Sequence, residues 1–218
     1  MLTRDSRFKQ CGAALVEFQI VALLALLPMM FGMLQTAFLL GAHHTLQYAT
    51  FSAARAGAMA NASPAIMRRA LATGLVPLFA MTADGVSADN VTGVVTGAFV
   101  KAYGATQLYA RLQVLSPSAE SFEDFGVVED GVTLIRNDSL EHRSVQRGSR
   151  SGLSIQEANL LRLRVTYCHE LIVPFADRLL LASLRRLDLD PFSQFCYLRG
   201  RVPLVAESSV NMQSDAHE

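Results

Sequence analysis

The distribution of hydrophobic residues divides the chain into one long apolar run near its start and a larger, mixed remainder. The run extends from Phe18 to Ala42, and no Asp, Glu, Lys or Arg occurs between Glu17 and Arg55. As a helix with a rise of 1.5 Å per residue, the run would span roughly 37 Å, which exceeds the ~30 Å hydrocarbon core of a bilayer. The pattern therefore predicts a transmembrane helix over residues 18–42.

A stripe of small residues continues the helical pattern beyond the apolar run. Its members recur at i, i+4, i+7 and i+11, and they are Ala49, Ala53, Ala56 and Ala60. Small side chains at this spacing let two helices approach closely, so we expect the stripe to be a helix-packing surface. The apolar run and this extension together predict one long N-terminal helix over residues 13–62.

Two prolines mark a weak point inside the long helix and the start of the next one. Pro28 removes a backbone donor in the middle of the apolar run, so we expect a local kink or an unwound turn there. The sequence NASP at residues 61–64 ends the long helix. Because Ser63 is a favourable N-cap and Pro64 a favourable first residue, a second helix is expected from Pro64 to about Ala80.

Three later segments alternate between apolar and polar residues with a period of two, which is typical of strands with one buried face. The apolar positions are Leu108, Ala110, Leu112 and Val114 in the first, Leu161, Leu163, Val165 and Tyr167 in the second, and Val202, Leu204, Ala206, Val210 and Met212 in the third. Between the last two, residues 174–187 have the pattern of an amphipathic helix, which either covers a sheet face or lies on a membrane surface. We therefore expect an α+β domain over residues 63–218, with a small antiparallel sheet and packed helices.

The composition narrows the possible functions. The chain has 218 residues, with 19 Lys and Arg against 19 Asp and Glu. A net charge near zero without a run of like charges gives no electrostatic footprint for nucleic acid, so no nucleic-acid partner is expected. No nucleophile-elbow, Walker or Rossmann motif occurs, and neither His43-His44 nor His169-Glu170 has a second ligand pair at zinc-like spacing. We therefore expect neither an enzyme nor a bound metal or cofactor.

Glu17 is the most informative single residue, because a carboxylate at the start of an apolar run is expensive to desolvate without a partner. Solvation by lipid headgroups is one explanation. The other rests on its surroundings, since the residues GAALVEF at 12–18 follow a basic leader with Arg4, Arg7 and Lys9 and immediately precede the apolar run. This arrangement resembles the class III signal of type IV prepilins, specifically that of the TadE-like minor pilins (pseudopilins) of the tight-adherence (Tad) pilus.

Further segments extend the resemblance beyond the signal. The residues LQYATFSAARAGAMA at 46–60 resemble the Ala- and Arg-rich helix extension of TadE-like proteins. Residues 160–174 and 201–214 resemble their C-terminal part more loosely, whereas residues 116–152 match only in fragments. That middle segment carries many charges, so it is either a solvated loop or a contact surface for another pilus subunit.

The resemblance implies how the N-terminus is processed. In that family, a prepilin peptidase cuts after a glycine on the cytoplasmic face. A cut after Gly12 would remove a leader of residues 1–12 and make Ala13 the new N-terminus, with Glu17 fifth and the aromatic Phe18 sixth. The Glu17 carboxylate of one subunit would then be a charge partner for the Ala13 α-amine of its neighbour, which relieves the desolvation of both groups.

The resemblance also implies partners and a location. The expected partners are the prepilin peptidase, other pilin and pilus-assembly subunits, and the inner membrane. The basic leader favours a cytoplasmic N-terminus, so the chain would cross the membrane once and expose its C-terminal domain to the periplasm. It would either stay in the membrane or later enter an extracellular pilus.

The cysteines fit this location. Cys11 lies in the leader and would be discarded with it. Cys168 and Cys196 lie in the exported part, where an oxidising compartment permits a disulfide. Such a bridge would close a loop of about 28 residues and stabilise the domain by about 3–4 kcal/mol in the chain-entropy model.

Two alternatives stand beside the pilin interpretation. A single-pass anchored periplasmic domain could act as a scaffold or sensor without polymerising, which predicts an intact N-terminus and tolerance of substitutions at Glu17. A cleaved secretory signal would share the basic leader, although its apolar region is normally only about 7–15 residues long.

Overall fold

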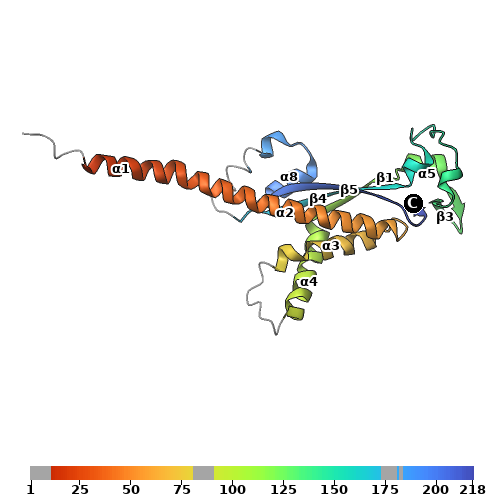
Figure 1. Cartoon of the computed structure of the whole chain (residues 1–218), viewed down its shortest axis with the longest axis horizontal. Coiled ribbons are helices and arrows are strands. Elements are labelled where there is room, and N and C mark those ends of the chain that lie inside the picture. Colours follow the sequence, from red (N-terminus) through yellow and green to blue (C-terminus); the bar gives the residue numbers. More distant parts are fainter. Residues whose placement is uncertain (1–10, 81–90, 173–180, 182–183) are drawn as a thin grey trace, which may run out of the picture.

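One long helix projects from an α+β domain that gathers along its C-terminal part (Figure 1). The helix consists of α1 (Cys11–Val21), a π-helical turn (Ala22–Leu26) and α2 (Leu27–Ala58). This computed structural model describes residues 11–80, 91–172, 181 and 184–218. The expected fold class, a long N-terminal apolar helix followed by helices and small antiparallel sheets, is confirmed.

The irregular turn in the long helix lies directly before Pro28. The backbone N–H of Leu27 donates to the carbonyl of Ala22, five residues earlier, instead of following the four-residue α-helical pattern. Pro28 has no N–H to donate, and it stands in the first turn of α2. The weak point predicted at Pro28 is therefore present as a widened turn next to the proline, and the helix continues through it.

The long helix ends where the chain turns back to form a helical hairpin. Asn61 and Ala62 both have positive φ angles, at 56° and 57°, which no α-helix accommodates. The helix α3 (Pro64–Ala80) then begins at the expected proline, and the carbonyl of Ser63 accepts from Met67 at 3.1 Å. The prediction of a second helix from Pro64 to about Ala80 is confirmed.

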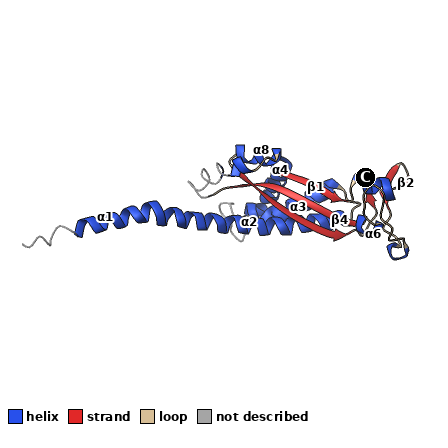
Figure 2. Ribbon diagram, turned by 90° about the horizontal axis from the view of Figure 1, so that it is seen from above, coloured by secondary structure: helices blue, strands red, loops and turns tan. Residues whose placement is uncertain are grey.

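The two helices of this hairpin touch at glycines. A Cβ atom at Gly74 of α3 would lie 2.6 Å from the Cα atom of Ala49 on α2. A Cβ atom at Gly57 would lie 2.6 Å from Met67 and 3.2 Å from Leu161. These close approaches let α3 and the sheet pack directly on the backbone of α2. Figure 2 shows α3 and the strands gathered along the C-terminal part of the long helix.

The main sheet has three antiparallel strands in the order β1-β4-β5, formed by β1 (Ala110–Ser116), β4 (Leu160–Glu170) and β5 (Arg201–Asn211). The central strand β4 pairs along its whole length with β5, from Leu160↔Asn211 to Glu170↔Arg201. Its alternate residues Leu161, Leu163, Val165 and Tyr167 are all buried, as the period-two pattern predicts. Together with Leu46, Met67, Leu71 and Leu75 of the helices, they form the core.

The first predicted strand begins two residues later than the pattern suggested. Residues 108 and 109 still belong to α4 (Val91–Tyr109), so Leu108 lies on a helix and is exposed, and Val114 is also partly exposed. The helix α4 contains many Gly and β-branched residues, and these lower its intrinsic helix propensity. For this reason the sequence pattern did not predict a helix there. It forms because Ala98, Ala102 and Thr106 recur at four-residue spacing as a buried stripe.

Residues 116–152 are folded and do not form the simple solvated loop that was one expectation. They contain α5 (Ala119–Phe125), β2 (Val127–Glu129), β3 (Val132–Ile135) and the short 3₁₀ helix at 140–142. With β6 (Ala216–His217), these strands form a second sheet in the order β2-β3-β6. Asp130 and Gly131 make the hairpin turn with positive φ angles, a conformation that this residue pair favours.

Asp124 fixes the loop that follows the second sheet. Its carboxylate accepts from the backbone N–H and the hydroxyl of Ser151, both at 2.7 Å, and also from Arg150 and Ser149. These donors, those of Ser151 above all, hold the pKa of Asp124 below its ordinary value. The loop then leads into α6 (Ile155–Ala158). Ser154 and Glu157 form a capping box at the N-terminus of this helix.

The connection between β4 and β5 contains a helix that the sequence did not predict, α8 (Pro191–Leu198). Asp190 caps it by accepting from the backbone N–H of Ser193 at 3.0 Å. The expected amphipathic helix at 174–187 lies mostly outside the described residues, although Leu181 and residues 184–187 are helical. Figure 2 shows α8 at one end of the sheet, on the side from which the long helix projects.

The contact between Gly74 and Ala49 gives the first prediction. We expect Gly74→Ala to lower the free energy of unfolding by about 1–3 kcal/mol, because the added methyl group meets the backbone of α2. Thermal or denaturant unfolding of the detergent-solubilised protein measures the change. Gly104→Ala is the matched control: it lies inside α4 with nothing within 4 Å of its Cβ position, so its stability should stay the same or rise. Equal effects of the two substitutions would contradict close packing at Gly74.

Candidate functional site

The projecting part of the long helix exposes bulky apolar side chains on all its faces. The stretch Leu15–Ala58 is long and apolar enough to cross a membrane, and none of its most apolar part is buried within the chain. Phe18 is 71% exposed and Leu24 76% exposed. Because such a surface is unfavourable in water, residues 18–42, called the apolar segment below, require lipid or other helices around them.

The predicted processing and assembly residues lie together at the start of this helix. Gly12 and Ala13 stand in the first turn of α1. Glu17 and Phe18 are both exposed, and no ion pair joins Glu17 to any residue in the described part of the chain. Since positions four apart share one helix face, Glu17 lies one turn above Ala13 on the same side. The carboxylate is therefore accessible to a neighbouring molecule.

The alanine stripe packs mainly within the chain. Ala49 and Ala53 are completely buried, and Ala49 lies against Gly74 of α3. Ala56 is only partly buried, and Ala60 lies in the turn after the helix has ended. In this structure the first two alanines thus join the long helix to its own domain, and only the remaining two are accessible to another helix.

The long helix is attached to the sheet at two levels. His43, just beyond the apolar segment, donates from Nε2 to the carbonyl of Val205 on β5 at 3.1 Å. At the other end, the carbonyl of Ala58 accepts from the backbone N–H groups of Gln213 and Ser214, at 2.9 and 3.1 Å. These bonds satisfy a backbone acceptor at the helix C-terminus that would otherwise have no partner.

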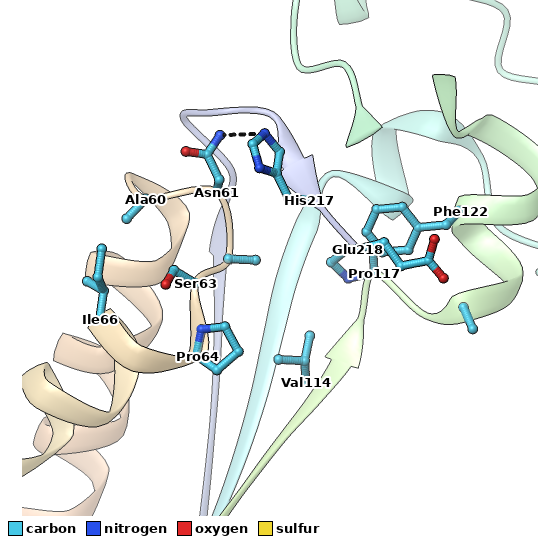
Figure 3. A pocket seen from close by; sticks show the side chains of 12 residues that line it. Ala60, Asn61, Ser63, Pro64, Ile66, Val114, Pro117, Phe122, His217 and Glu218 are labelled. Atoms are coloured by element: carbon cyan, nitrogen blue, oxygen red, sulfur yellow. Dashed lines mark hydrogen bonds between the residues drawn. The ribbon is translucent and has the colours of Figure 1, made fainter. Parts of the chain in front are cut away.

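Asn61 completes this attachment, a role that the sequence analysis did not foresee. Its backbone N–H donates to the hydroxyl of Ser214 at 2.9 Å, and its side-chain amide donates to the carbonyl of Asp215 at 2.8 Å. The same amide donates to Nε2 of His217 at 3.2 Å, as the dashed line in Figure 3 shows. The helical turn and the C-terminal strand therefore hold each other in place.

A cavity of about 680 Å³ opens beside this turn, at the end of the domain away from the apolar segment. Pro64, Val114 and Phe122 contribute much of its apolar wall, while Asn61 and His217 lie at its edge (Figure 3). The lining of this cavity is therefore mainly apolar, with polar groups at its edge.

A second cavity, of about 550 Å³, lies at the opposite end of the sheet. Burial lowers the pKa of His169 there, and the positive charge of Arg201 lowers it further. Burial also raises the pKa of Tyr167. Arg201 itself pairs with Glu170 at 2.9 Å and lies over the ring of Tyr109 at 4.2 Å. Both effects favour the neutral form of the imidazole, and the Arg201 guanidinium is already paired with Glu170.

The two cysteines expected to pair are close together in the fold. Cys168 on β4 and Cys196 on α8 are joined by a disulfide with a Cα–Cα distance of 5.3 Å. Both are completely buried. Within the described residues, no group of three or more His, Cys, Asp or Glu side chains is arranged to hold a metal ion.

A comparison with known protein families gave a match over the N-terminal helix. Residues 12–55 match the family model described as TadE-like protein. Neither the curated proteins nor the solved structures compared with the chain gave a match. The match begins at Gly12, includes Glu17 and the whole apolar segment, and ends near the C-terminus of α2. The long N-terminal helix of this chain is therefore a TadE-like segment, as its resemblance to the TadE-like pilins implied.

Proposed function

We propose that this protein is a minor pilin or pseudopilin that takes part in the assembly or function of a Tad-type pilus. The observation that carries the proposal is the TadE-like match over residues 12–55, on a helix whose apolar segment projects from the domain. A prepilin peptidase would cut after Gly12, and the mature chain would assemble through its N-terminal helix with other pilin and pilus-assembly subunits.

The mechanism is binding rather than catalysis. The apolar segment would first anchor the chain in the inner membrane and would later pack among other helices, because both surroundings remove apolar side chains from water. Glu17 of one subunit would pair with the free α-amine of Ala13 in its neighbour. An ion pair in an apolar setting is favourable only when both partners are present, so it would set the register between subunits.

The location follows from the same proposal. The apolar segment would cross the inner membrane once, with residues 1–12 in the cytoplasm before cleavage. Residues 63–218 would form the periplasmic domain, which would prime, cap or regulate the fibre. The widened turn before Pro28 would allow the helix to bend or stretch as it leaves the bilayer.

The N-terminus tests this proposal most directly. We expect the protein from its own host to begin at Ala13 when the prepilin peptidase is present and at Met1 when the peptidase gene is deleted, as intact mass and N-terminal sequencing would show. A chain that begins at Met1 in both strains would favour the anchored scaffold or sensor. A chain cut after the apolar segment would indicate a secreted protein.

The role of Glu17 gives a second test. We expect Glu17→Ala to leave membrane insertion unchanged and to reduce incorporation into pili by about tenfold or more, because the partner amine would be left unpaired in an apolar setting. Immunoblots of membranes and of sheared pili measure the two quantities. Gln19→Ala, which changes an exposed polar residue two positions away, should leave both unchanged. Normal incorporation of Glu17→Ala would remove this residue from the mechanism.

The proposed export also predicts the state of the cysteines. The mature protein should show no free thiol after unfolding without reductant, since Cys11 is lost with the leader and Cys168 is bonded to Cys196. Uncleaved protein should show one. Replacing both Cys168 and Cys196 by Ser should lower the free energy of unfolding by about 2–4 kcal/mol. Two free thiols in the mature protein would contradict an oxidised, exported domain.

A further inference from the structure

The end of the domain nearest the apolar segment exposes leucines to an unusual degree. We call residues 184–201, which include α8, the proximal corner. Within it, Leu187 is 81% exposed, Leu189 90% and Leu198 65%. Single exposed leucines are common on protein surfaces, but three within one short segment are an unusual concentration of apolar side chains at this end of the domain.

The proximal corner is held firmly, so these leucines are fixed in place by the fold. The side-chain amide of Gln194 donates to the carbonyl of Arg185 at 3.0 Å and also to that of Asp188. The hydroxyl of Tyr197 donates to the Asp188 carboxylate at 3.2 Å. The bond between Cys196 and the central strand then fastens the whole corner to the sheet.

The acidic residues of the proximal corner are engaged within the domain. Asp190 pairs with Arg111 at 3.1 Å and caps α8. Asp188 accepts from the backbone N–H of Asp190 at 3.0 Å and from Tyr197. Both carboxylates therefore have partners within the domain, and the side chain of Asp190 is 36% exposed.

The basic residues are arranged differently. Arg185, Arg186 and Arg199 are exposed, and none of them forms an ion pair with another described residue. Arg199 lies over the ring of Phe195 at 5.4 Å, which orients its guanidinium without neutralising it. The outer surface of the proximal corner thus combines apolar side chains with positive charge.

The attachments of β5 to the long helix show how far along the helix this corner reaches. From His43 to Ala58 the helix advances roughly 22 Å, and from Val205 to Gln213 the strand advances roughly 26 Å, so the two run side by side in the same direction. Arg201, where β5 begins, lies roughly 13 Å before Val205. That is the level of about residue 34, which is inside the apolar segment.

This level lies just inside the edge of a bilayer. A hydrocarbon core of ~30 Å needs only about 20 helical residues, so a helix that enters at Phe18 leaves the core near residue 38. Figure 1 shows α8 at the end of the domain from which the apolar segment projects. The start of β5 is therefore roughly 6 Å inside that edge, and the proximal corner lies at the boundary between the hydrocarbon core and the lipid headgroups.

From these observations we propose that the proximal corner binds the surface of the same bilayer and recognises anionic phospholipids. The leucines enter the boundary between headgroups and acyl chains, while Arg185, Arg186 and Arg199 contact the lipid phosphates. The inference rests on the proposed membrane anchoring and adds a second attachment, which orients the domain against the membrane until the chain enters a fibre. Because the apolar segment already holds the corner near the surface, docking is an intramolecular step and a small patch suffices.

The absence of Trp from the sequence makes a direct test possible, since one introduced Trp is then the sole indole of the chain. Full-length protein carrying Leu189→Trp would be reconstituted into phosphatidylcholine bilayers with and without phosphatidylglycerol. We expect blue-shifted emission and strong quenching by lipids brominated near the top of the acyl chain, both greater with phosphatidylglycerol. Val145→Trp is the matched control: it replaces a side chain that is 75% exposed, in the loop that Asp124 anchors, and its emission should not respond.

A third indole separates this inference from the membrane anchoring on which it rests. Leu24→Trp, in the apolar segment, should be quenched by deeply brominated lipids in both bilayers. Quenching at Leu24→Trp but not at Leu189→Trp would overturn lipid docking and leave the anchor intact, whereas no quenching at Leu24→Trp would overturn both. A blue shift at Leu189→Trp without bromolipid quenching would indicate a second copy of the chain on this surface and would also overturn the inference.

The arginines test the electrostatic part separately. Combining Leu189→Trp with Arg185→Gln, Arg186→Gln and Arg199→Gln should abolish the effect of phosphatidylglycerol, because each arginine near an anionic surface changes the docking equilibrium about fivefold. The quenching at Leu24→Trp should be unchanged by the same three substitutions. An undiminished response to phosphatidylglycerol would contradict phosphate recognition by these side chains.

Discussion

The whole structure depends on one helix that must satisfy two different surroundings along its length. Before Ala42 most of its side chains are bulky and exposed, which suits lipid or other helices. From Leu46 to Ala58 its face toward the domain consists of small or completely buried residues, whereas Tyr48 and Phe51 are exposed on the outside. Gly57 allows Met67 and Leu161 to reach the helix backbone. A helix with large side chains throughout would not pack so closely against α3 and β4, and one with small side chains throughout would be a poor membrane anchor. The change in residue size between these two parts therefore decides where the domain begins.

Much of this arrangement could be read from the sequence because the signals were local or strongly periodic. A Ser followed by a Pro, as at Ser63 and Pro64, is a local signal for the start of a helix. The alternation from Leu161 to Tyr167 predicts a strand with one buried face. The helix α4 was missed because its Gly and Val content opposes helix formation, and only packing of Ala102 against the neighbouring helix makes it stable. The second sheet was missed because its strands are too short to show a period, although Asp130-Gly131 is a recognisable hairpin turn.

Only those parts of the candidate site that have a local sequence pattern could be predicted. Glu17 and Phe18 could be singled out because an apolar run with a single carboxylate at its edge is visible in sequence alone. Both are exposed, and their contact with other molecules stays a prediction. The attachment of Asn61 to Ser214 and His217 joins residues from opposite ends of the domain, so no local pattern could reveal it. Likewise, α8 lies at the level of the end of the apolar segment because of the way β5 lies along the helix. Only the folded chain shows this arrangement.

The bonds between Ala58 and the segment after β5 have a mechanical consequence. A subunit held by its N-terminal helix in an assembly experiences axial tension whenever the outer end is pulled. β5 runs alongside α2 and is bonded to it at Val205, and the segment just after β5 is bonded to Ala58. Such a load therefore acts in shear on the contact between helix and sheet, so its hydrogen bonds and apolar contacts resist together rather than opening one after another. The central strand β4, paired with β5 over its full length, then carries the force across the domain. The same contacts that close the fold thus form a continuous route for tensile stress through the subunit.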